Sequence, residues 1–546
     1  MVQTGRQAEK RKGRAASPGL ASGPVVPIED VAPRTEAMTA VAADPAAELA
    51  SLAQALEGAS SQLAALIDRV DADAAEMLEF QLAMIEDEEL SAPAVAAITD
   101  GAAAPVAFAA ALDAAIAGYL ASDDDYFRAR SADLSDIRDR VLRLLADPGM
   151  AERRESPKGA ILVGVDITPS RFLEVDWSAG GAIALAEGSP SSHVAMLARA
   201  RGVPMVTGLG VLDIDERAVA IVDGETGTVW FDPDAAMQAE HEALRARRAH
   251  EADAARAYLD KPARTACGEA VSVMVNIAEP DEVDGIDPAH CDGVGLMRTE
   301  FLFHGPGGLP DEETQYRAYR KVLEWAGGRS VTIRTLDAGG DKPVPGLTIA
   351  EANPFLGCRG IRLSLLRPGV FRVQLRALAR AAVHGNLQVM LPMVSRPEEV
   401  GRAGELFDAC IAELRAEGVE AVRRPPLGIM VEVPCVAITP ERFLAADFFS
   451  IGSNDLTQYV MAAGRDSAEV AEIGRADDPA VLALVEATVR AGEAAERSVS
   501  LCGDAGSDLD VLPKLLARGV RRVSIAPAAL ARVKASIAAM RLDTDG

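Results

Sequence analysis

The sequence has few aromatic residues, few cysteines and a deficit of positive charge. Phe, Trp and Tyr together make up 4% of the 546 residues, and 55 Lys and Arg residues stand against 82 Asp and Glu residues, a net charge of −27. A field this negative disfavours a nucleic-acid backbone as a partner, although a local group of arginines can still bind a small anion. The apolar content of 49% is that of a globular protein with large cores, which excludes a disordered chain.

Long apolar runs are also absent, so we expect no membrane insertion. A spanning helix needs about 18 or more apolar residues, and the closest stretch, residues 102–121, is interrupted by Pro105 and Asp113. We interpret that stretch as a helix of a bundle. Residues 1–14 are basic and lack the apolar core of a secretory signal. The six cysteines are widely spaced without a CxxC pair, which argues against a disulfide framework and indicates a reducing, cytoplasmic location.

The first half of the chain changes character twice. Residues 15–30 have the pattern of a glycine-punctuated strand, whereas residues 35–147 are rich in Ala, Leu, Asp and Glu with leucines at helical spacing. This spacing predicts a bundle of about four or five helices. Buried-type strands then resume, and a hairpin is predicted at 218–230. We therefore predict an α/β domain formed by residues 1–34 and 148–233, with the bundle of residues 35–147 inserted into it.

The second half has the pattern of a barrel behind a linker. Residues 234–262 are charged and lack an apolar stripe, which is typical of a solvated linker helix; we expect His241 and His250 within it to be solvated. In residues 263–546, strand-like runs alternate with helical patterns, which predicts a (β/α)8 barrel. The eight runs are Val271–Asn276, Gly293–Met297, Val331–Leu336, Leu387–Met393, Leu427–Val433, Phe448–Ile451, Val499–Cys502 and Arg522–Ala526.

Charged and polar side chains gather where the predicted barrel strands end. Active sites of such barrels lie at the carboxyl ends of the strands, so these side chains are expected to meet in one pocket. Chance polarity of the loops is the alternative, but only the fourth of the first seven strand ends is apolar. The strand-end residues with useful chemistry are Arg298, Arg334, Glu432, Asn454, Asp455 and Cys502.

His193 is the candidate nucleophile. It ends the segment Gly188-Ser189-Pro190-Ser191-Ser192-His193, which follows a predicted strand and leads into a predicted helix. The N–H groups and the dipole at a helix start favour an anionic group, so a histidine there can attack phosphorus and hold the phosphoryl group. A capped helix with a packed histidine would give the same local pattern.

Taken together, these motifs resemble enzyme I of the phosphoenolpyruvate-dependent sugar phosphotransferase system. The match around the phosphorylated histidine comprises Gly188, Ser192, His193, Ala198 and Arg199. Ser189, Cys358 and Asp504 depart from the family pattern, which has a second glycine, an aromatic residue and Glu at these places. The barrel motifs that match are Gly295–Phe303, Arg334–Asp337 with Gly339–Lys342, Asn353–Arg359, Glu432–Pro434, Ser450–Tyr459 and Cys502–Asp504.

The resemblance implies a swivelling phosphohistidine α/β domain with an inserted helical bundle, and a C-terminal (β/α)8 barrel that binds phosphoenolpyruvate. It implies transfer of the phosphoryl group to His193 and then to a histidine of the carrier protein HPr, docked on the bundle, with release of pyruvate. It also implies a homodimer formed through the barrel. The implied residues are Cys502 as the proton donor, Arg298, Arg334, Arg359, Asn454, Asp455 and Arg465 for substrate, and Glu432 and Asp455 for Mg²⁺.

Two other functions remain open from the sequence. Pyruvate phosphate dikinase and phosphoenolpyruvate synthase share the histidine domain and the barrel, but they need a nucleotide-binding domain, and no Gly-rich nucleotide loop precedes residue 150. A regulatory scaffold with a degenerate site agrees with the three departures, whereas every proposed catalytic residue is present.

Overall fold

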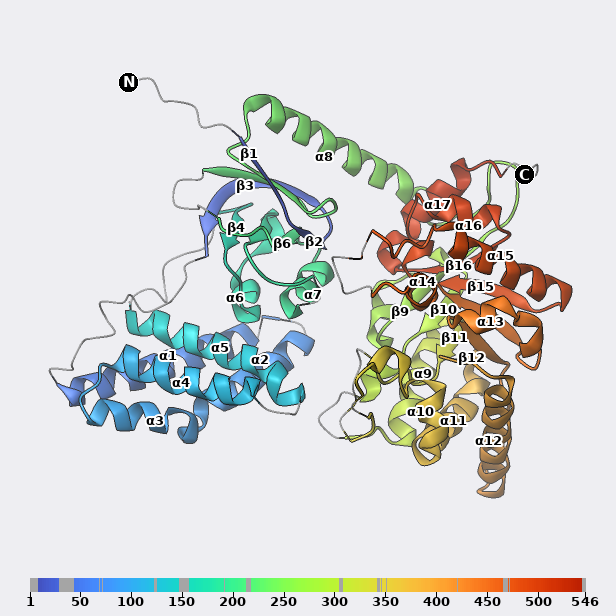
Figure 1. Cartoon of the computed structure of the whole chain (residues 1–546), viewed down its shortest axis with the longest axis horizontal. Helices are drawn as coiled ribbons and strands as arrows, with labels where there is room; N and C mark the ends of the chain where they lie inside the picture. Colours follow the sequence, from blue (N-terminus) through green and yellow to red (C-terminus); the bar gives the residue numbers. More distant parts are fainter. Residues whose placement is uncertain are drawn as a thin grey trace. The chain divides into compact units, whose positions relative to one another are not determined.

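The chain forms two compact units, Met1–Ala246 and Arg247–Gly546, in the computed structural model shown in Figure 1. Each unit is described by itself. The structure describes residues 8–28, 44–67, 69–70, 72–121, 125–146, 157–190, 192–212, 218–303, 308–340, 344, 346–349, 351–419, 421–464, 470 and 472–542.

The first unit contains an eight-stranded mixed sheet with the strand order β1-β8-β7-β3-β4-β5-β6-β2. Its central strands β4 and β5 are short apolar runs whose residues are all buried, as expected for parallel strands covered on both faces. The strands are β1 (Glu9–Lys12), β2 (Arg14–Ser17), β3 (Leu20–Pro27), β4 (Ile161–Gly164), β5 (Ala182–Leu185), β6 (Met205–Thr207), β7 (Val219–Asp223) and β8 (Thr228–Phe231).

A helical bundle stands between β3 and β4 in the chain. The Ala-rich stretch forms one of its helices, and Phe108 and Leu112 of that helix are fully buried in the core. No helix in the described part of the chain is long and apolar enough to cross a membrane. The bundle helices are α1 (Pro45–Ile67), α2 (Ala72–Glu86), α3 (Glu88–Thr99), α4 (Ala104–Leu120) and α5 (Asp125–Ala146).

A buried polar cluster joins the bundle to the α/β part of the unit. Arg140 of α5 is 2% exposed, and its Nη2 donates to Ser170 Oγ at 2.8 Å and to Glu174 Oε1 at 2.6 Å, both on α6 (Pro169–Glu174). Asp136 Oδ1 accepts a hydrogen bond from Ser170 Oγ at 2.7 Å. Because these buried charges are paired and hydrogen-bonded, the helix that follows β4 is fixed to α5.

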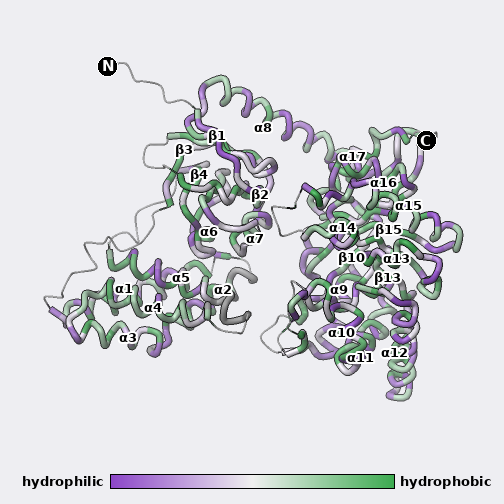
Figure 2. Tube along the Cα trace, in the orientation of Figure 1, coloured by the Kyte–Doolittle hydropathy of each residue, from purple (hydrophilic) through white to green (hydrophobic). Residues whose placement is uncertain are grey.

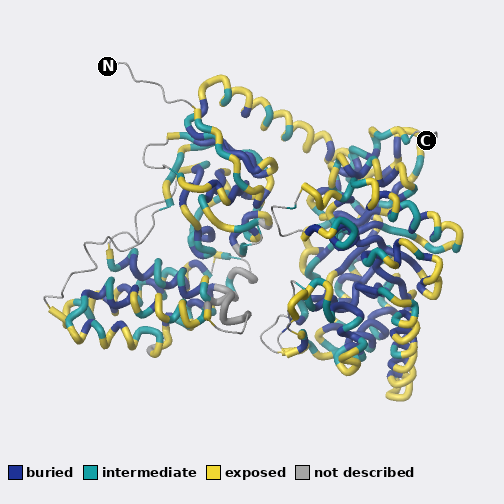
Figure 3. The backbone as a smooth tube through the Cα atoms, in the orientation of Figure 1, coloured by how far each residue is buried: buried dark blue, intermediate teal, exposed yellow. Residues whose placement is uncertain are grey.

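The helix α8 (Ala235–Arg256) follows the sheet. Figure 2 shows hydrophilic and hydrophobic residues alternating along it, and Figure 3 shows that most of it is exposed. The expectation that both of its histidines are solvated is wrong for one of them: His250 is exposed, but His241 is only 8% exposed. His241 lies in the first half of the helix, within the first compact unit.

The second unit is a closed barrel of eight parallel strands, β9 to β16, in chain order. The predicted fold class is confirmed, and each predicted barrel strand lies within two residues of an observed one; β1 and β6 of the first unit were not predicted. The barrel strands are β9 (Ser272–Ile277), β10 (Gly293–Met297), β11 (Ser330–Arg334), β12 (Asn386–Leu391), β13 (Leu427–Val431), β14 (Phe448–Gly452), β15 (Ser498–Cys502) and β16 (Arg522–Ile525).

Helices surround this barrel, and Figure 3 shows the strands buried inside them. Strands from β9 to β16 contribute buried apolar side chains to one core. Active sites of such barrels lie at the carboxyl ends of the strands. The helices of the second unit are α9 (Glu312–Ala326), α10 (Ile361–Leu366), α11 (Pro368–Ala381), α12 (Pro397–Ala416), α13 (Pro434–Ile438), α14 (Ser453–Met461), α15 (Pro479–Ala494), α16 (Leu512–Ala517) and α17 (Leu530–Ala539).

Replacement of Arg140 by Leu tests the cluster between α5 and α6. The substitution removes the hydrogen bonds that the buried guanidinium donates to Ser170 and Glu174, while Arg171 still pairs with Glu174 at 3.0 Å. We expect the free energy of opening of these two helices to fall by about 2 kcal/mol, the scale of a lost hydrogen bond to a charged group. Amide hydrogen exchange of peptides from α5 and α6 measures the change.

Arg138→Leu on the same helix is the matched control. The guanidinium of Arg138 pairs with Asp113 at 2.5 Å and Asp139 at 2.9 Å, but its side chain is 30% exposed. Such surface pairs contribute about 1 kcal/mol or less. Equal acceleration of exchange in both variants would contradict the role assigned to Arg140.

Candidate active site

A cavity opens at the carboxyl ends of β10, β11, β13, β14 and β15. Seven of the nine candidate residues line it, and they come from segments up to about two hundred residues apart in the sequence. Two candidates do not: His193 belongs to the first unit, and Arg465 lies outside the described residues. The lining residues are Leu296, Arg298, Arg334, Arg359, Met430, Glu432, Gly452, Ser453, Asn454, Asp455, Cys502 and Gly503.

Arg334 is a buried cation at this cavity. It ends β11 and is 5% exposed; its Nη2 lies 3.0 Å from Glu300 Oε2, and its Nη1 lies 3.1 Å from Asp337 Oδ2. Burial disfavours the charge, but the surrounding carboxylates, first Glu300 and then Asp337, outweigh burial and raise the pKa of Arg334. The Nε of Arg334 has no acceptor among the described residues. A permanent cation with a free N–H group therefore lines the cavity.

Arg359 shares one of these carboxylates. It is 1% exposed, and its Nε and Nη2 donate to the two oxygens of Asp337 at 3.3 and 2.8 Å. Its Nη1 donates to the hydroxyl of Tyr459 at 3.3 Å, and this hydroxyl donates to the carbonyl of Phe355 at 2.5 Å. The fork on Asp337 fixes the plane of the guanidinium, and Tyr459 ties the loop that carries Arg359 to α14.

Two carboxylates at the cavity keep buried oxygens without a donor. Glu432 is 1% exposed and its Oε1 accepts the N–H of Met393 at 2.6 Å, but its Oε2 has no hydrogen-bond partner in the described ranges. Asp455 Oδ1 is in the same condition and lies 3.6 Å from Arg359 Nη1. Burial, together with the neighbouring carboxylates, raises the pKa of Glu432 to about 8. Buried carboxylate oxygens that accept no hydrogen bond are costly, so a hard cation fits this pair.

Cys502 is a buried thiol at the end of β15. It is 2% exposed, its Sγ accepts a hydrogen bond from Ser450 Oγ at 3.5 Å, and it donates to the carbonyl of Ile451 at 3.5 Å. Burial raises the pKa of the Cys502 thiol to about 11, against the opposing effect of the Ser450 hydrogen bond. The thiol is therefore protonated near neutral pH and carries the proton that a general acid needs.

Asp504, which follows β15 where the family pattern has Glu, is hydrogen-bonded to Asn454 of the cavity. Asp504 Oδ2 accepts a hydrogen bond from Asn454 Nδ2 at 3.1 Å, and the N–H of Asp504 donates to Asn454 Oδ1 at 3.0 Å. Gly503 between them and Cys502 has φ +109°, and a Cβ there would lie 2.3 Å from Ser453 Oγ. Only glycine fits this position, so the turn holds Asn454 and Cys502 beside the same cavity.

Arg298 differs from the two buried arginines. It follows β10, it is exposed, and it makes no ion pair with any residue that the structure describes. Because the chain carries an excess of negative charge, an unpaired guanidinium at a cavity is unusual. It is the group best placed to bind an anion that enters from solvent.

The segment that leads to His193 is built for a tight turn and a helix start. Gly188 follows β5 with φ +92°, a conformation that glycine adopts without strain. α7 (His193–Ala200) begins at His193, and Ser192 caps it by accepting the N–H of Ala195 at 3.2 Å. His193 therefore stands in the first turn of a capped helix, where helix N–H groups and the dipole favour an anion.

Arg199, one of the residues that carried the resemblance, supports this segment. Its Nη1 donates to the carbonyl of Pro190 at 2.8 Å and to the carbonyl of Ala16 at 2.5 Å. Burial lowers the pKa of Arg199. The arginine thus ties the approach to His193 to the end of β2, from within the first unit alone.

Several residues that shape the cavity had no role in the sequence-based interpretation. Glu300 and Asp337 were named only as parts of motifs, yet they neutralise Arg334. The rule that a buried arginine needs a carboxylate would have pointed to both, since they lie in the same strand-end segments. Ser450 and Tyr459 act through contacts with distant segments, and nothing in their sequence neighbourhood signals those contacts.

Comparisons with known proteins agree with this geometry. Residues 12–130 match the N-terminal domain of PEP-utilising enzymes, residues 156–227 match their mobile domain, and residues 252–542 match their PEP-binding domain. The last of these matches contains the whole barrel and its cavity.

Three relatives are phosphoenolpyruvate-protein phosphotransferases. The protein of Geobacillus stearothermophilus is 34% identical over 96% of this chain and 92% of its own length, and that of Lactococcus lactis is 34% identical over 98% and 94%. The protein of Haloferax volcanii is 40% identical over 75% of this chain and 72% of its own length. The chain belongs to this family. The sequence-based identification as an enzyme I is confirmed, and the chain is a phosphoenolpyruvate-dependent phosphotransferase.

Solved structures similar to the chain include a solution structure of an Enzyme I protein, which is 24% identical with a TM-score of 0.36 and covers 44% of this chain and 99% of that one. An N-terminal domain of a nitrogen Enzyme 1 is 24% identical with a TM-score of 0.33, covering 43% of this chain and 98% of that one.

The reactivity of Cys502 toward iodoacetamide tests its protonation state. The thiolate is the reactive form, and its fraction rises about tenfold per pH unit below the pKa. Because the pKa of Cys502 is about 11, we expect little alkylation at pH 7 and a rate that still rises at pH 10. Mass spectrometry of the modified peptides resolves Cys502 from the exposed Cys267 and Cys435, which are internal controls. Alkylation of Cys502 that reaches its plateau by pH 8 would contradict a buried thiol.

Proposed function

We propose that this phosphotransferase accepts the phosphoryl group of phosphoenolpyruvate on His193 and passes it to a histidine of the carrier protein HPr. The observation that supports this most is the set of open polar atoms at one cavity: Arg334 Nε for an anion, and Glu432 Oε2 and Asp455 Oδ1 for a cation. Phosphoenolpyruvate with a divalent metal has both kinds of charge. Capped α7 provides the site that receives the phosphoryl group.

The substrate has a phosphate and a carboxylate on a three-carbon frame. Arg298 and Arg334 stand at the ends of adjacent strands, and each guanidinium can bind two oxygens of one anionic group. Asn454, which follows β14, supplies an amide to the same cavity. Arg465 is assigned to the substrate by the resemblance alone. Arg359 is already held by two hydrogen bonds to Asp337, so we expect it to neutralise the negative charge of the substrate from a fixed position, without rotating toward it.

Glu432 and Asp455 are the residues that would hold a metal ion, and Mg²⁺ is the ion that the family resemblance implies. Mg²⁺ is commonly bound through one or two carboxylates with the remaining positions left to substrate oxygens and water, which agrees with two open oxygens here. When bound, such a cation supplies charge neutralisation of the phosphate and of the developing enolate.

The transfer is a displacement at phosphorus. An imidazole nitrogen of His193 forms the new P–N bond while the P–O bond to the enol oxygen breaks, and that oxygen takes the electron pair. As the oxygen becomes the carbonyl of pyruvate, the methylene carbon takes the proton of the Cys502 thiol. The thiolate regains a proton before the next turnover. The high pKa of Cys502 keeps this proton in place until the enolate has formed.

His193 and the cavity belong to different units, so transfer requires the units to approach one another and then to separate. We propose the domain limits of the sequence analysis for this movement: residues 1–34 and 148–233 as the phosphohistidine domain, 35–147 as the bundle that docks HPr, 234–262 as the linker and 263–546 as the barrel. Domain rotations of this kind take microseconds to seconds. The acidic chain favours a partner with a basic face.

The location and the assembly are also part of the proposal. All six cysteines are free thiols, which is consistent with a reducing cytoplasm. A homodimer through the barrel follows from the family resemblance. Pyruvate is the second product.

Labelling with phosphoenolpyruvate tests the acceptor residue. Incubation of the full chain with radiolabelled phosphoenolpyruvate and MgCl2 is expected to place one label per chain on the peptide that contains His193, because its imidazole is the nucleophile. His193→Ala is expected to abolish this label, as read from a phosphopeptide map.

His384→Ala is the matched control for that experiment. This barrel histidine is hydrogen-bonded to the hydroxyl of Tyr316 at 2.8 Å and does not line the cavity. Its replacement should leave the labelling intact. An unlabelled wild type, or equal label on His193→Ala and wild type, would contradict the proposed function.

Glu432→Gln tests the metal site. The amide keeps the shape of the side chain but removes the charge that binds a cation, so we expect the MgCl2 concentration needed for half-maximal labelling to rise about 10- to 100-fold, the scale seen when a residue that supports a metal site is replaced. The titration of labelling rate against MgCl2 measures this. Glu441→Gln, at an exposed position in the segment that follows α13, serves as the control. An unchanged Mg²⁺ requirement in Glu432→Gln would remove Glu432 from the site.

A further inference from the structure

The two arginine-bearing strands lose their backbone pairing where the cavity begins. β10 pairs with β11 from Gly293 to Met297, with Met297 opposite Ile333. Arg298 and Arg334 therefore stand one residue beyond the last pair. Backbone N–H groups past this point must find partners elsewhere, because a buried N–H group without an acceptor is costly.

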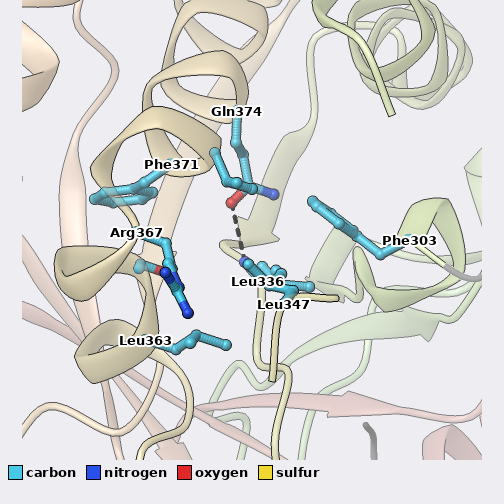
Figure 4. A pocket seen from close by; sticks show the side chains of 9 residues that line it. Phe303, Leu336, Leu347, Leu363, Arg367, Phe371 and Gln374 are labelled. Atoms are coloured by element: carbon cyan, nitrogen blue, oxygen red, sulfur yellow. Dashed lines mark hydrogen bonds between the residues drawn. The ribbon is translucent and has the colours of Figure 1, made fainter. Parts of the chain in front are cut away.

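A glutamine from a helix supplies that pairing. Gln374 of α11 is 1% exposed, and its Oε1 accepts the N–H of Leu336 at 3.0 Å, as the dashed line in Figure 4 shows. Its Nε2 donates to Thr299 Oγ1 at 3.3 Å and to the hydroxyl of Tyr319 at 3.1 Å. A backbone N–H can only donate, so the carbonyl of the Gln374 amide must face Leu336 and its NH₂ must face Thr299.

These contacts bracket the two arginines. Thr299 follows Arg298 directly, and its Oγ1 donates to the carbonyl of Arg334 at 3.0 Å. Leu336 lies between Arg334 and Asp337, the carboxylate that neutralises Arg334. The amide of Gln374 thus connects the end of β10 to the end of β11 without touching either guanidinium.

The surroundings make this connection strong and specific. Gln374 and Leu336 line a small apolar cavity with Phe303, Leu363 and Phe371, and Figure 4 shows these side chains around the hydrogen bond. Hydrogen bonds in an apolar setting are stronger, and a group that loses its partner there cannot turn to water. The hydrogen bond from Gln374 to Tyr319 also joins α11 to α9. The Tyr319 hydroxyl is oriented in turn by donating to Gln315 Oε1 of α9 at 2.9 Å.

We propose that Gln374 is a positioning residue for phosphoenolpyruvate: it sets the separation of the strand ends that carry Arg298 and Arg334. This inference rests on the proposed function, because it assumes that both arginines bind the same substrate. A shift of one strand end changes the distance between the two guanidinium groups, and binding of a rigid three-carbon substrate is sensitive to that distance.

The test is Gln374→Leu in the full chain. Leu has a similar size and removes all three hydrogen bonds. We expect the KM for phosphoenolpyruvate in the labelling reaction to rise about tenfold while kcat at saturating substrate changes much less, because Gln374 contacts neither the reacting phosphorus nor Cys502. Thr299→Val removes the shared partner with little change in volume, and we expect it to raise KM in the same direction.

Gln388→Leu is the matched control. Gln388 makes the same kind of contacts at the opposite end of the barrel, where its Oε1 accepts hydrogen bonds from Ser330 Oγ and Thr332 Oγ1, both at 3.2 Å. A KM shift in the Gln374 and Thr299 variants but not in the Gln388 variant would support the proposal. Equal shifts in the Gln374 and Gln388 variants, or no shift in the Gln374 and Thr299 variants, would overturn it. A wild-type chain that takes up no label would instead overturn the proposed function, and the inference with it.

Discussion

The arrangement of arginines at the carboxyl ends of the barrel strands depends on the carboxylate of Asp337. This carboxylate accepts hydrogen bonds from Nε and Nη2 of Arg359 and pairs with Arg334, and all three side chains are at most 5% exposed. Two guanidinium groups repel one another in a buried setting, and the shared anion offsets this repulsion together with Glu300, which also pairs with Arg334. Because Asp337 follows Arg334 by three residues, one strand end supplies both the cation and the anion that keeps it in place.

Neutralisation is incomplete, and the remainder gives the cavity its chemistry. Asp337 pairs with two arginines, whereas among the described residues Glu432 Oε2 and Asp455 Oδ1 accept no hydrogen bond and Arg298 makes no ion pair. The cavity can therefore accept a cation at the two carboxylates and an anion at Arg298. In the proposed function, phosphoenolpyruvate with a divalent ion supplies both charges at once, although the chain has a net charge of −27.

The sequence predicts elements that depend on local pattern and fails where contacts between distant segments decide. The eight barrel strands follow from apolar runs separated by helical patterns, and the strand-end residues follow from the strands. β1 is a charged strand that pairs with β8 at the sheet edge, and β6 has three residues, so neither has an apolar pattern to detect. The roles of Gln374 and Tyr459 depend on which helix packs beside which strand end, and that is a property of the packed barrel rather than of spacing in the chain.

The two units divide the work because each is stabilised within itself. The buried residues of the barrel core run from Ala263 onward, with Leu259 packed against them, whereas the first unit has cores of its own, one of which joins the bundle helices to the sheet. The supports of His193, through Ser192 and Arg199, also lie within the first unit. The His193 segment therefore has supports inside its own unit, and the Arg140 cluster joins the bundle to α6 of the same unit. For the movement proposed above, this construction lets the first unit shift as one body.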